Sequence, residues 1–166
     1  MIKIKMEIFT INNKKEEKIL RRKTPDFDFS RFKNNEIQET IKKMRMAIKK
    51  EKGIGLSANQ IGLDLNVFVA QVKNKFYAIF NPLIIARSEE ESVVEEGCLS
   101  VPKVFGNVSR SEKIVLEGYD RNGKKIKIKA WGLLARVFQH EFDHLNGKIF
   151  IDRTKDLHKY EDASNK

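Results

Sequence analysis

The side chains best suited to chemistry lie in the segment Q-H-E-F-D-H at residues 139–144. Two histidines four residues apart lie on the same face of a helix, so their imidazoles can converge on one metal ion. Glu141 follows the first histidine, where its carboxylate can reach a metal-bound water without displacing it. The spacing is that of the H-E-x-x-H motif. The alternative is an ordinary histidine pair on an amphipathic helix.

A catalytic site of this kind normally has three protein ligands and one open position, so the chain must supply a third ligand. Cys98 is the only cysteine and the only soft ligand available. A lone cysteine between glycine and leucine is, however, most often a small buried hydrophobe. No intramolecular disulfide is possible, and the thiol is buried, reactive or a ligand. A reducing compartment suits all three.

Length and composition predict one domain with a substantial core. A chain of 166 residues buries about 70% of the surface that its unfolded form exposes. No apolar run approaches the roughly 18 residues of a membrane span. Residues 1–10 alternate apolar and charged side chains, which predicts a strand rather than a signal peptide. We therefore expect a cytoplasmic protein without a membrane partner.

The net charge of +10 would favour polyanions. The lysines are scattered among glutamates, and no nucleic-acid-binding motif or interleaved aromatic platform is evident. A solvated lysine-rich surface is the simpler interpretation.

Periodic segments must position the candidate site. Residues 30–51 repeat apolar side chains every three to five positions, which predicts an amphipathic helix. Residues 65–70 and 76–80 are rich in strand formers, and Asn81-Pro82 is expected to end the second strand. Residues 12–23 are charged and poorly patterned, and predict no element.

The C-terminal half contains clearer signals. Residues 114–119 and 126–130 alternate on either side of an Asn-Gly turn, which predicts a hairpin. The motif helix is expected to begin near Trp131, and Gly147 lies soon after its expected end. Residues 53–60, G-I-G-L-S-A-N-Q, contain glycines that form either a helix cap and turn or a backbone surface open to an extended substrate.

Three stretches in this order, G-I-G-L-S-A-N-Q, E-E-G-C-L-S and Q-H-E-F-D-H, resemble the three signature motifs of the peptide deformylase family. The match continues between and after them, at Pro82, Val101-Pro102, Arg110, residues 120–123 and residues 145–153. Ser57 and Asn59 depart from the family pattern, in which alanine and proline or another small residue are common there. These two departures bear on fine specificity rather than on activity.

The resemblance implies an α+β fold in which antiparallel β-sheets pack around a central helix carrying the HEFDH motif, with an N-terminal amphipathic helix. It places a single catalytic domain at residues 1–153. The segment 154–166 is a polar tail, and from its composition we expect disorder there and a solvated His158. The resemblance further implies that Cys98, His140 and His144 hold one divalent metal. Fe²⁺ is expected in vivo, and Zn²⁺, Ni²⁺ or Co²⁺ are acceptable in purified protein, because sulfur and imidazole suit all of these.

The same resemblance assigns catalytic roles. Glu141 is implied as the proton acceptor and donor, and the Gln60 side-chain amide with the Leu99 backbone N–H as donors to an oxyanion. Arg110 either pairs with Glu96 to brace the cysteine loop or forms a surface ion pair. The implied substrate-binding residues, whose apolar members could equally be core, are Gly53, Ile54, Gly55, Val94, Gly97, Leu133 and Val137.

The activity implied is hydrolysis of the formyl amide of N-formylmethionyl nascent peptides, which releases formate. One alternative is another HExxH-type metallohydrolase, against which Cys98 argues because a thiolate makes a metal less electrophilic. The other is an inactive deformylase-like metal-binding protein, such as one that contacts the ribosome through its basic surface. Glu141 and Gln60 argue against this second alternative, because neither is needed to hold a metal.

Overall fold

The computed structural model describes residues 7–160. The helices are α1 (Lys14–Leu20), α2 (Asn34–Lys50) and α3 (Gly132–Leu145), with short 3-10 helices η1 (Phe29–Arg31), η2 (Ala58–Ile61) and η3 (Phe150–Asp152). The strands are β1 (Gly55–Ser57), β2 (Val67–Val72), β3 (Lys75–Arg87), β4 (Glu91–Cys98), β5 (Val101–Ser111), β6 (Lys113–Tyr119), β7 (Lys125–Trp131) and β8 (Leu157–Lys159). Within this part of the chain, no helix is both long and apolar enough to cross a membrane.

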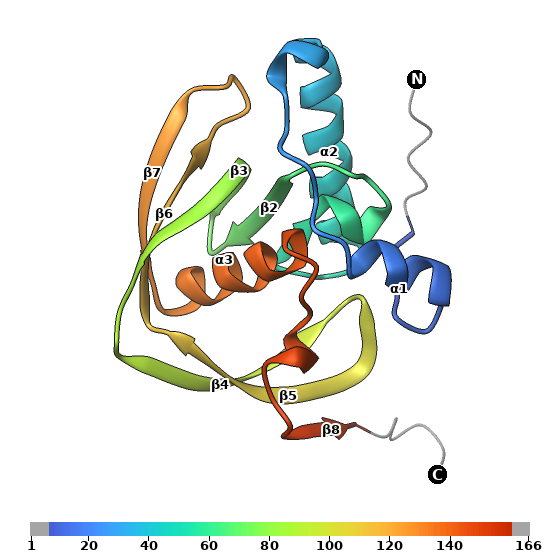
Figure 1. Ribbon diagram of the computed structural model, residues 1–166, viewed down its shortest axis with the longest axis vertical. Helices are drawn as coiled ribbons and strands as arrows, with labels where there is room; N and C mark the ends of the chain where they lie inside the picture. Colours follow the sequence, from blue (N-terminus) through green and yellow to red (C-terminus); the bar gives the residue numbers. More distant parts are fainter. Residues whose placement is uncertain (1–6, 161–166) are drawn as a thin grey trace.

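Two antiparallel sheets surround the motif helix. The larger has the order β1-β2-β3-β6-β7 and the smaller the order β4-β5-β8. Figure 1 shows α3 at the centre of the molecule, between the larger sheet and the β4–β5 hairpin. Helix α3 inserts Ala135, Phe138 and Leu145 into a core formed with Phe68 and Leu116 of the larger sheet. The expected α+β fold around a central motif helix is confirmed.

Helix α2 covers the other side of β1–β3. Its apolar face, Ile37, Ile41, Met44, Ala47 and Ile48, is buried as the sequence pattern predicts. The helix begins at Asn34 rather than near residue 30, because Asp28 accepts from the Ser30 N–H and holds the preceding residues in η1. The amide of Lys33 donates to the Glu36 carboxylate at 2.8 Å, which caps the first turn.

Strand β3 does not end at Asn81-Pro82, so that prediction was wrong. The β3–β6 register shifts between Phe80 and Leu83, and Asn81 has a φ of 47°. This bulge accommodates the proline, and the strand continues to Arg87. The Asn81 side chain accepts from the Phe27 N–H at 2.7 Å and donates to the Phe27 carbonyl at 2.9 Å, which attaches the N-terminal segment to the sheet.

The two ends of the chain differ from expectation. Residues 1–6 of the predicted first strand lie outside the described residues, and residues 7–10 form no strand. Helix α1 was not predicted, although Asn13 caps it by accepting from the Lys15 and Glu16 N–H groups. The predicted hairpin is confirmed as β6–β7. The tail was expected to be disordered, but β8 pairs with β5 beyond the predicted domain boundary at residue 153.

Candidate metal centre

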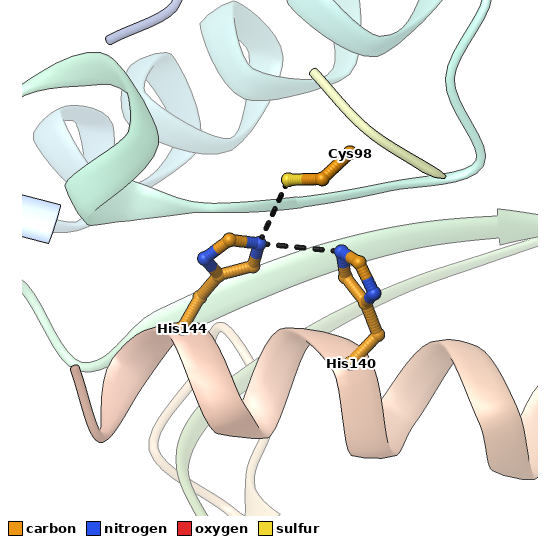
Figure 2. A group of neighbouring side chains, drawn as sticks. All are labelled: Cys98, His140 and His144. Atoms are coloured by element: carbon orange, nitrogen blue, oxygen red, sulfur yellow. Dashed lines mark hydrogen bonds between the residues drawn. The ribbon is translucent and has the colours of Figure 1, made fainter. Parts of the chain in front are cut away.

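Helix α3 presents two histidines on one face, and the end of β4 brings Cys98 opposite them (Figure 2). The Nε2 atom of His144 lies 3.2 Å from Nε2 of His140 and 3.2 Å from Sγ of Cys98. The three candidate ligand atoms all lie within 4.8 Å of one another. Two nitrogens and one sulfur therefore converge on a common point.

The spacing and chemistry of this set fit a divalent ion. In a tetrahedral site with metal distances of about 2.0–2.1 Å to nitrogen and about 2.3 Å to sulfur, the ligand atoms lie about 3.3–3.6 Å apart. His144 is fully buried, and its Nδ1 has no hydrogen-bond partner among residues 7–160. Burial lowers the pKa of His144 well below its ordinary value, so its imidazole is neutral, as a metal ligand requires.

Cys98 lies where the β4–β5 ladder loses its regular register, because the pairing shifts between Gly97 and Cys98. The Ser100 N–H donates to Sγ at 3.4 Å, and Nε2 of Gln60 donates to it at 3.5 Å. These two contacts fix the position of Sγ beside the histidine nitrogens.

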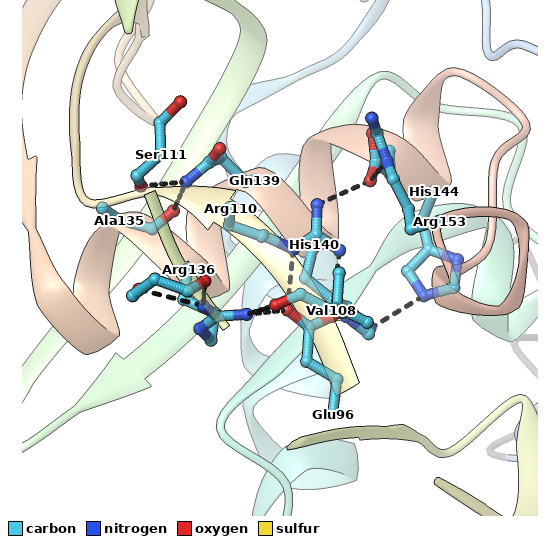
Figure 3. Close-up of polar contacts among 12 residues, drawn as sticks. Glu96, Val108, Arg110, Ser111, Ala135, Arg136, Gln139, His140, His144 and Arg153 are labelled. Carbon is cyan, nitrogen blue, oxygen red and sulfur yellow. Dashed lines mark hydrogen bonds and ion pairs between the residues drawn. The ribbon is translucent and has the colours of Figure 1, made fainter. Parts of the chain in front are cut away.

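Glu96 orients His140 from behind the cluster (Figure 3). Its Oε2 lies 3.0 Å from Nδ1 of His140, so Nδ1 donates to the carboxylate and Nε2 faces the cluster. Arg110 donates to both oxygens of Glu96 at 2.7 and 2.9 Å, and Arg136 donates to Oε1 at 2.7 Å. Burial opposes the charged carboxylate, but the bonds from His140 and Arg110 hold the pKa of Glu96 well below its usual range.

The protonation of His140 follows from the same contacts. Burial opposes its charged form, but hydrogen bonds to Cys98 and Glu96 raise the pKa of His140 well above its ordinary value. A ligand imidazole must be neutral, so metal binding here displaces a proton.

Arg110 extends the network to Asp143. Its Nη1 donates to Oδ2 of Asp143 at 2.7 Å, and Nε of Arg153 donates to the same oxygen at 2.9 Å. Arg110 and Asp143 are buried. Of the two roles expected for Arg110, the bracing pair with Glu96 is confirmed, and it is not a surface ion pair.

Glu141 is buried beside the cluster, outside this network. Its Oε2 has no hydrogen-bond partner within the described part of the chain. Burial raises the pKa of its carboxyl to about 7. Strand β1 passes so close that a Cβ atom on Gly55 would lie 2.4 Å from Oε1 of Glu141. Glycine at this position leaves room for the carboxylate.

The residues around η2 hold the motif helix and face the cysteine. Oε1 of Gln60 accepts from the Ser57 N–H at 2.9 Å, while its Nε2 donates to Oγ of Ser100 at 3.1 Å. Nδ2 of Asn59 donates to the carbonyl of His144 at 2.7 Å, and Oγ of Ser57 donates to Oδ1 of Asn59 at 2.8 Å. Ser57 and Asn59 therefore position the last turn of α3.

A cleft of about 780 Å³ opens onto the cluster. Its lining includes Gly53, Ile54, Gly55, Val94, Gly97, Leu133 and Val137, all of which were expected to contact substrate. Val137 is buried, whereas Ile54, Val94 and Leu133 are each about half exposed and available to a ligand. Besides lining the cleft, Gly97 packs against Phe105: a Cβ atom at position 97 would lie 2.7 Å from the Phe105 ring, so a larger residue would clash.

Comparison with known protein sequences assigns the chain to a family. A family model described as polypeptide deformylase matches residues 5–160. The chain belongs to the peptide deformylase family. The peptide deformylase of Treponema pallidum (strain Nichols) is 48% identical over 101 residues, which cover 61% of this chain and 62% of that relative. The aligned region thus spans less than two thirds of the relative's length. The deformylase of Thermotoga maritima is 40% identical over 124 residues, or 75% of each chain.

Solved deformylase structures share the fold. The crystal structure of peptide deformylase from Thermotoga maritima superposes with a TM-score of 0.81 at 35% identity, covering 90% of this chain and 97% of that one. The enzyme from Synechococcus elongatus gives a TM-score of 0.83 at 30% identity, covering 94% and 82%. The likeness extends over nearly the whole described structure.

Deformylases are metal-dependent, and the three motifs of this chain meet at the candidate metal centre. Sequence reasoning missed Arg136, Asp143 and Arg153 as members of the network behind it. Arg136 could have been found, since it precedes His140 by four residues and shares its helix face. No local spacing in the sequence links Arg153 to Asp143, because only the folded chain brings these two residues together. His158, expected to be solvated, is 37% exposed and also pairs with Glu95 at 2.6 Å.

Proposed function

We propose that this protein is a metal-dependent hydrolase that removes the formyl group from the N-terminal formylmethionine of newly made polypeptides and releases formate. One observation carries the proposal: two imidazole nitrogens and a thiol sulfur converge near the buried carboxylate of Glu141, whose Oε2 has no hydrogen-bond partner among residues 7–160. Cys98, His140 and Glu141 line the same cleft as the apolar side chains of Ile54 and Leu133.

We infer that Cys98, His140 and His144 hold one divalent ion, Fe²⁺ in vivo, with Zn²⁺, Ni²⁺ or Co²⁺ able to replace it in purified protein. The thiolate and imidazole donors suit each of these ions. When bound, the ion supplies Lewis-acid activation of water, whose pKa falls to about 7 in well-studied zinc enzymes. Metal analysis of protein purified without oxygen identifies the native ion.

The side chains of this protein handle the protons and the developing charge. Glu141 accepts the proton of the attacking water and delivers it to the amine that leaves when the formyl C–N bond breaks. A carboxyl whose pKa is about 7 suits transfer in both directions near neutral pH. Nε2 of Gln60 and the Leu99 backbone N–H donate to the formyl oxygen as it gains negative charge.

The cleft supplies the specificity. Ile54, Val94, Leu133 and Val137 form apolar walls that receive the methionine side chain. Gly53, Gly55 and Gly97 leave backbone along which an extended peptide can lie.

The deciding experiment measures formate release from formyl-Met-Ala-Ser, with acetyl-Met-Ala-Ser and a peptide with internal methionine as controls. We expect rapid hydrolysis of the formyl peptide alone. Cleavage of the internal peptide would indicate a different metallohydrolase. Metal binding with no hydrolysis of any of the three would indicate an inactive metal-binding protein.

We also propose that the protein acts in the cytoplasm and contacts the ribosome through its basic surface. The net charge of +10 supports this contact. Co-sedimentation with ribosomes should occur at low salt and weaken as salt is raised. Absence of co-sedimentation at low salt would remove this part of the proposal.

A further inference from the structure

The rim of the cleft is built on a strand that the sequence pattern does not predict. Strand β8 lies beside β5 (Figure 1). The pairing of the two strands places His158 opposite Phe105. Strand β5 pairs in turn with β4, where Gly97 lies opposite Phe105. Glu95 and Phe105 both line the cleft. The C-terminal segment therefore lies directly behind two residues of the cleft wall.

Glu95 is held by two side chains of this segment. Nε2 of His158 lies 2.6 Å from Oε2 of Glu95, and the Tyr160 hydroxyl donates to Oε2 at 3.0 Å. The side chain of Glu95 is 40% exposed. The carboxylate is thus oriented by the tail while it still reaches the cleft.

Phe105 is fixed by the same two residues. Its ring lies edge-on to Tyr160, with centroids 5.0 Å apart, and is stacked on His158 at 6.4 Å. The ring also contacts the backbone at Gly97, where a Cβ atom would lie 2.7 Å away. Phe105 is therefore held between the tail and the strand that leads into Cys98.

We propose that His158 and Tyr160 are positioning residues for substrate recognition, and that they shape the part of the cleft that receives the third residue of the peptide. This inference rests on the proposed function. His140 and Glu141 line the reacting end of the cleft, and the methionine pocket accounts for its apolar walls. The remaining rim, which includes Phe105 and Pro102, offers an apolar surface to the third side chain of the peptide.

The test compares a short substrate, formyl-Met-Ala, with a longer one, formyl-Met-Ala-Leu. Tyr160→Phe keeps the ring beside Phe105 and removes only the hydroxyl that holds Glu95, whereas His158→Ala removes both a stacking contact and a polar contact. We expect each change to raise KM for the longer substrate by about three- to ten-fold, because lost ground-state contacts raise KM with kcat unchanged. KM for the short substrate, kcat and metal content should not change.

Lys159→Ala is the matched control, since its side chain alternates to the opposite face of the same strand and is exposed. It should behave as wild type with both substrates. Equal KM changes for both substrates, or loss of metal, would show a merely structural role and overturn the inference. Unchanged KM values in both tail variants would overturn it too, while leaving the proposed function intact. A wild-type protein inactive on every formyl substrate would instead overturn the proposed function, and this inference with it.

Discussion

The carboxylate of Glu141 lies directly against the backbone of Gly55: a Cβ atom at position 55 would lie 2.4 Å from Oε1 and 2.9 Å from Cδ. Real Cβ atoms do not approach other atoms so closely, so any larger residue must displace the carboxylate. The position of the proposed proton acceptor on α3 is therefore set by the absence of a side chain on β1.

Gly55→Ala should lower kcat by about 10²-fold, because a displacement of about 1 Å at a reacting group has costs of this order. Metal content should stay near wild type, since no ligand is touched. The comparison is Gly53→Ala, whose Cβ would meet only the flexible end of Leu99 at 3.3 Å. Because Gly53 lines the cleft, we expect this change to raise KM while kcat stays near wild type. Equal kcat values for the two variants would contradict the steric argument.

Glu141→Gln should separate catalysis from binding. The substitution preserves shape while it removes the proton acceptor, so we expect near-normal metal content and peptide affinity with a loss of turnover of about 10²- to 10⁴-fold. Formate release and metal analysis on the same preparation measure both quantities. Wild-type turnover in this variant would refute the assigned role.

Cys98→Ser should sharply reduce metal content while the fold remains largely present. An alcohol is a much poorer ligand than a thiolate for Fe²⁺, Zn²⁺, Ni²⁺ or Co²⁺. Metal analysis and circular dichroism together test this expectation. Full metal occupancy with unchanged activity would show that the thiol is not a ligand.

Discrimination at the methionine pocket should be graded. One methylene in an apolar pocket is worth only about 1–3 kcal/mol, so formyl-Met and formyl-norleucine peptides should be cleaved at similar rates. A formyl-Asp peptide should be cleaved far more slowly, because no contact in an apolar pocket replaces the hydration of its charge. If kcat/KM were the same for all three, the pocket would be wrongly assigned.

The metal-free protein should lose stability as the pH falls below about 5. The folded pKa of Glu96 is lowered by His140 and Arg110 against burial, and that of Asp143 by Arg153 and Arg110, also against burial. Unfolded carboxyls titrate near pH 4, so this stabilisation is complete above about pH 5 and is lost as pH falls through the unfolded and then the folded pKa.

Urea unfolding midpoints between pH 6 and pH 3 test this expectation. Glu96→Gln should be less stable at pH 6 and should show a flatter pH dependence than wild type. The control is Glu89→Gln, at an exposed position, which should keep the wild-type profile. Parallel profiles for the two variants would mean that Glu96 does not carry the effect.

Elements with strong local signals could be predicted from the sequence. Helix α2 follows from its apolar periodicity, and the β6–β7 hairpin from its Asn-Gly turn. The continuation of β3 past Pro82 could not be predicted, because it depends on a bulge against β6. Strand β8 was missed because a short polar segment becomes a strand only through its partner β5.

In the candidate site, too, some features could be predicted from local sequence signals and others depend on the folded chain. The motifs identified the residues that meet at the cluster, since the spacing of His140 and His144 on a helix is a local property. The role of Glu96 as acceptor for His140, Arg110 and Arg136 depends on how β4, β5 and α3 approach one another. The pKa of Glu141 likewise depends on burial that only the folded chain creates.

Cys98 carries the one thiol of this chain, and its sulfur faces the two histidine nitrogens. Alkylating reagents, peroxide and the metal ion must therefore compete for a single atom. Counting reactive sulfur per molecule would measure how many molecules in a preparation have a centre that is both empty and unoxidised. The chain has no second cysteine to trap a sulfenic acid as an internal disulfide, so continued oxidation of this sulfur leads to sulfinic and sulfonic acids and to permanent loss of the thiol ligand.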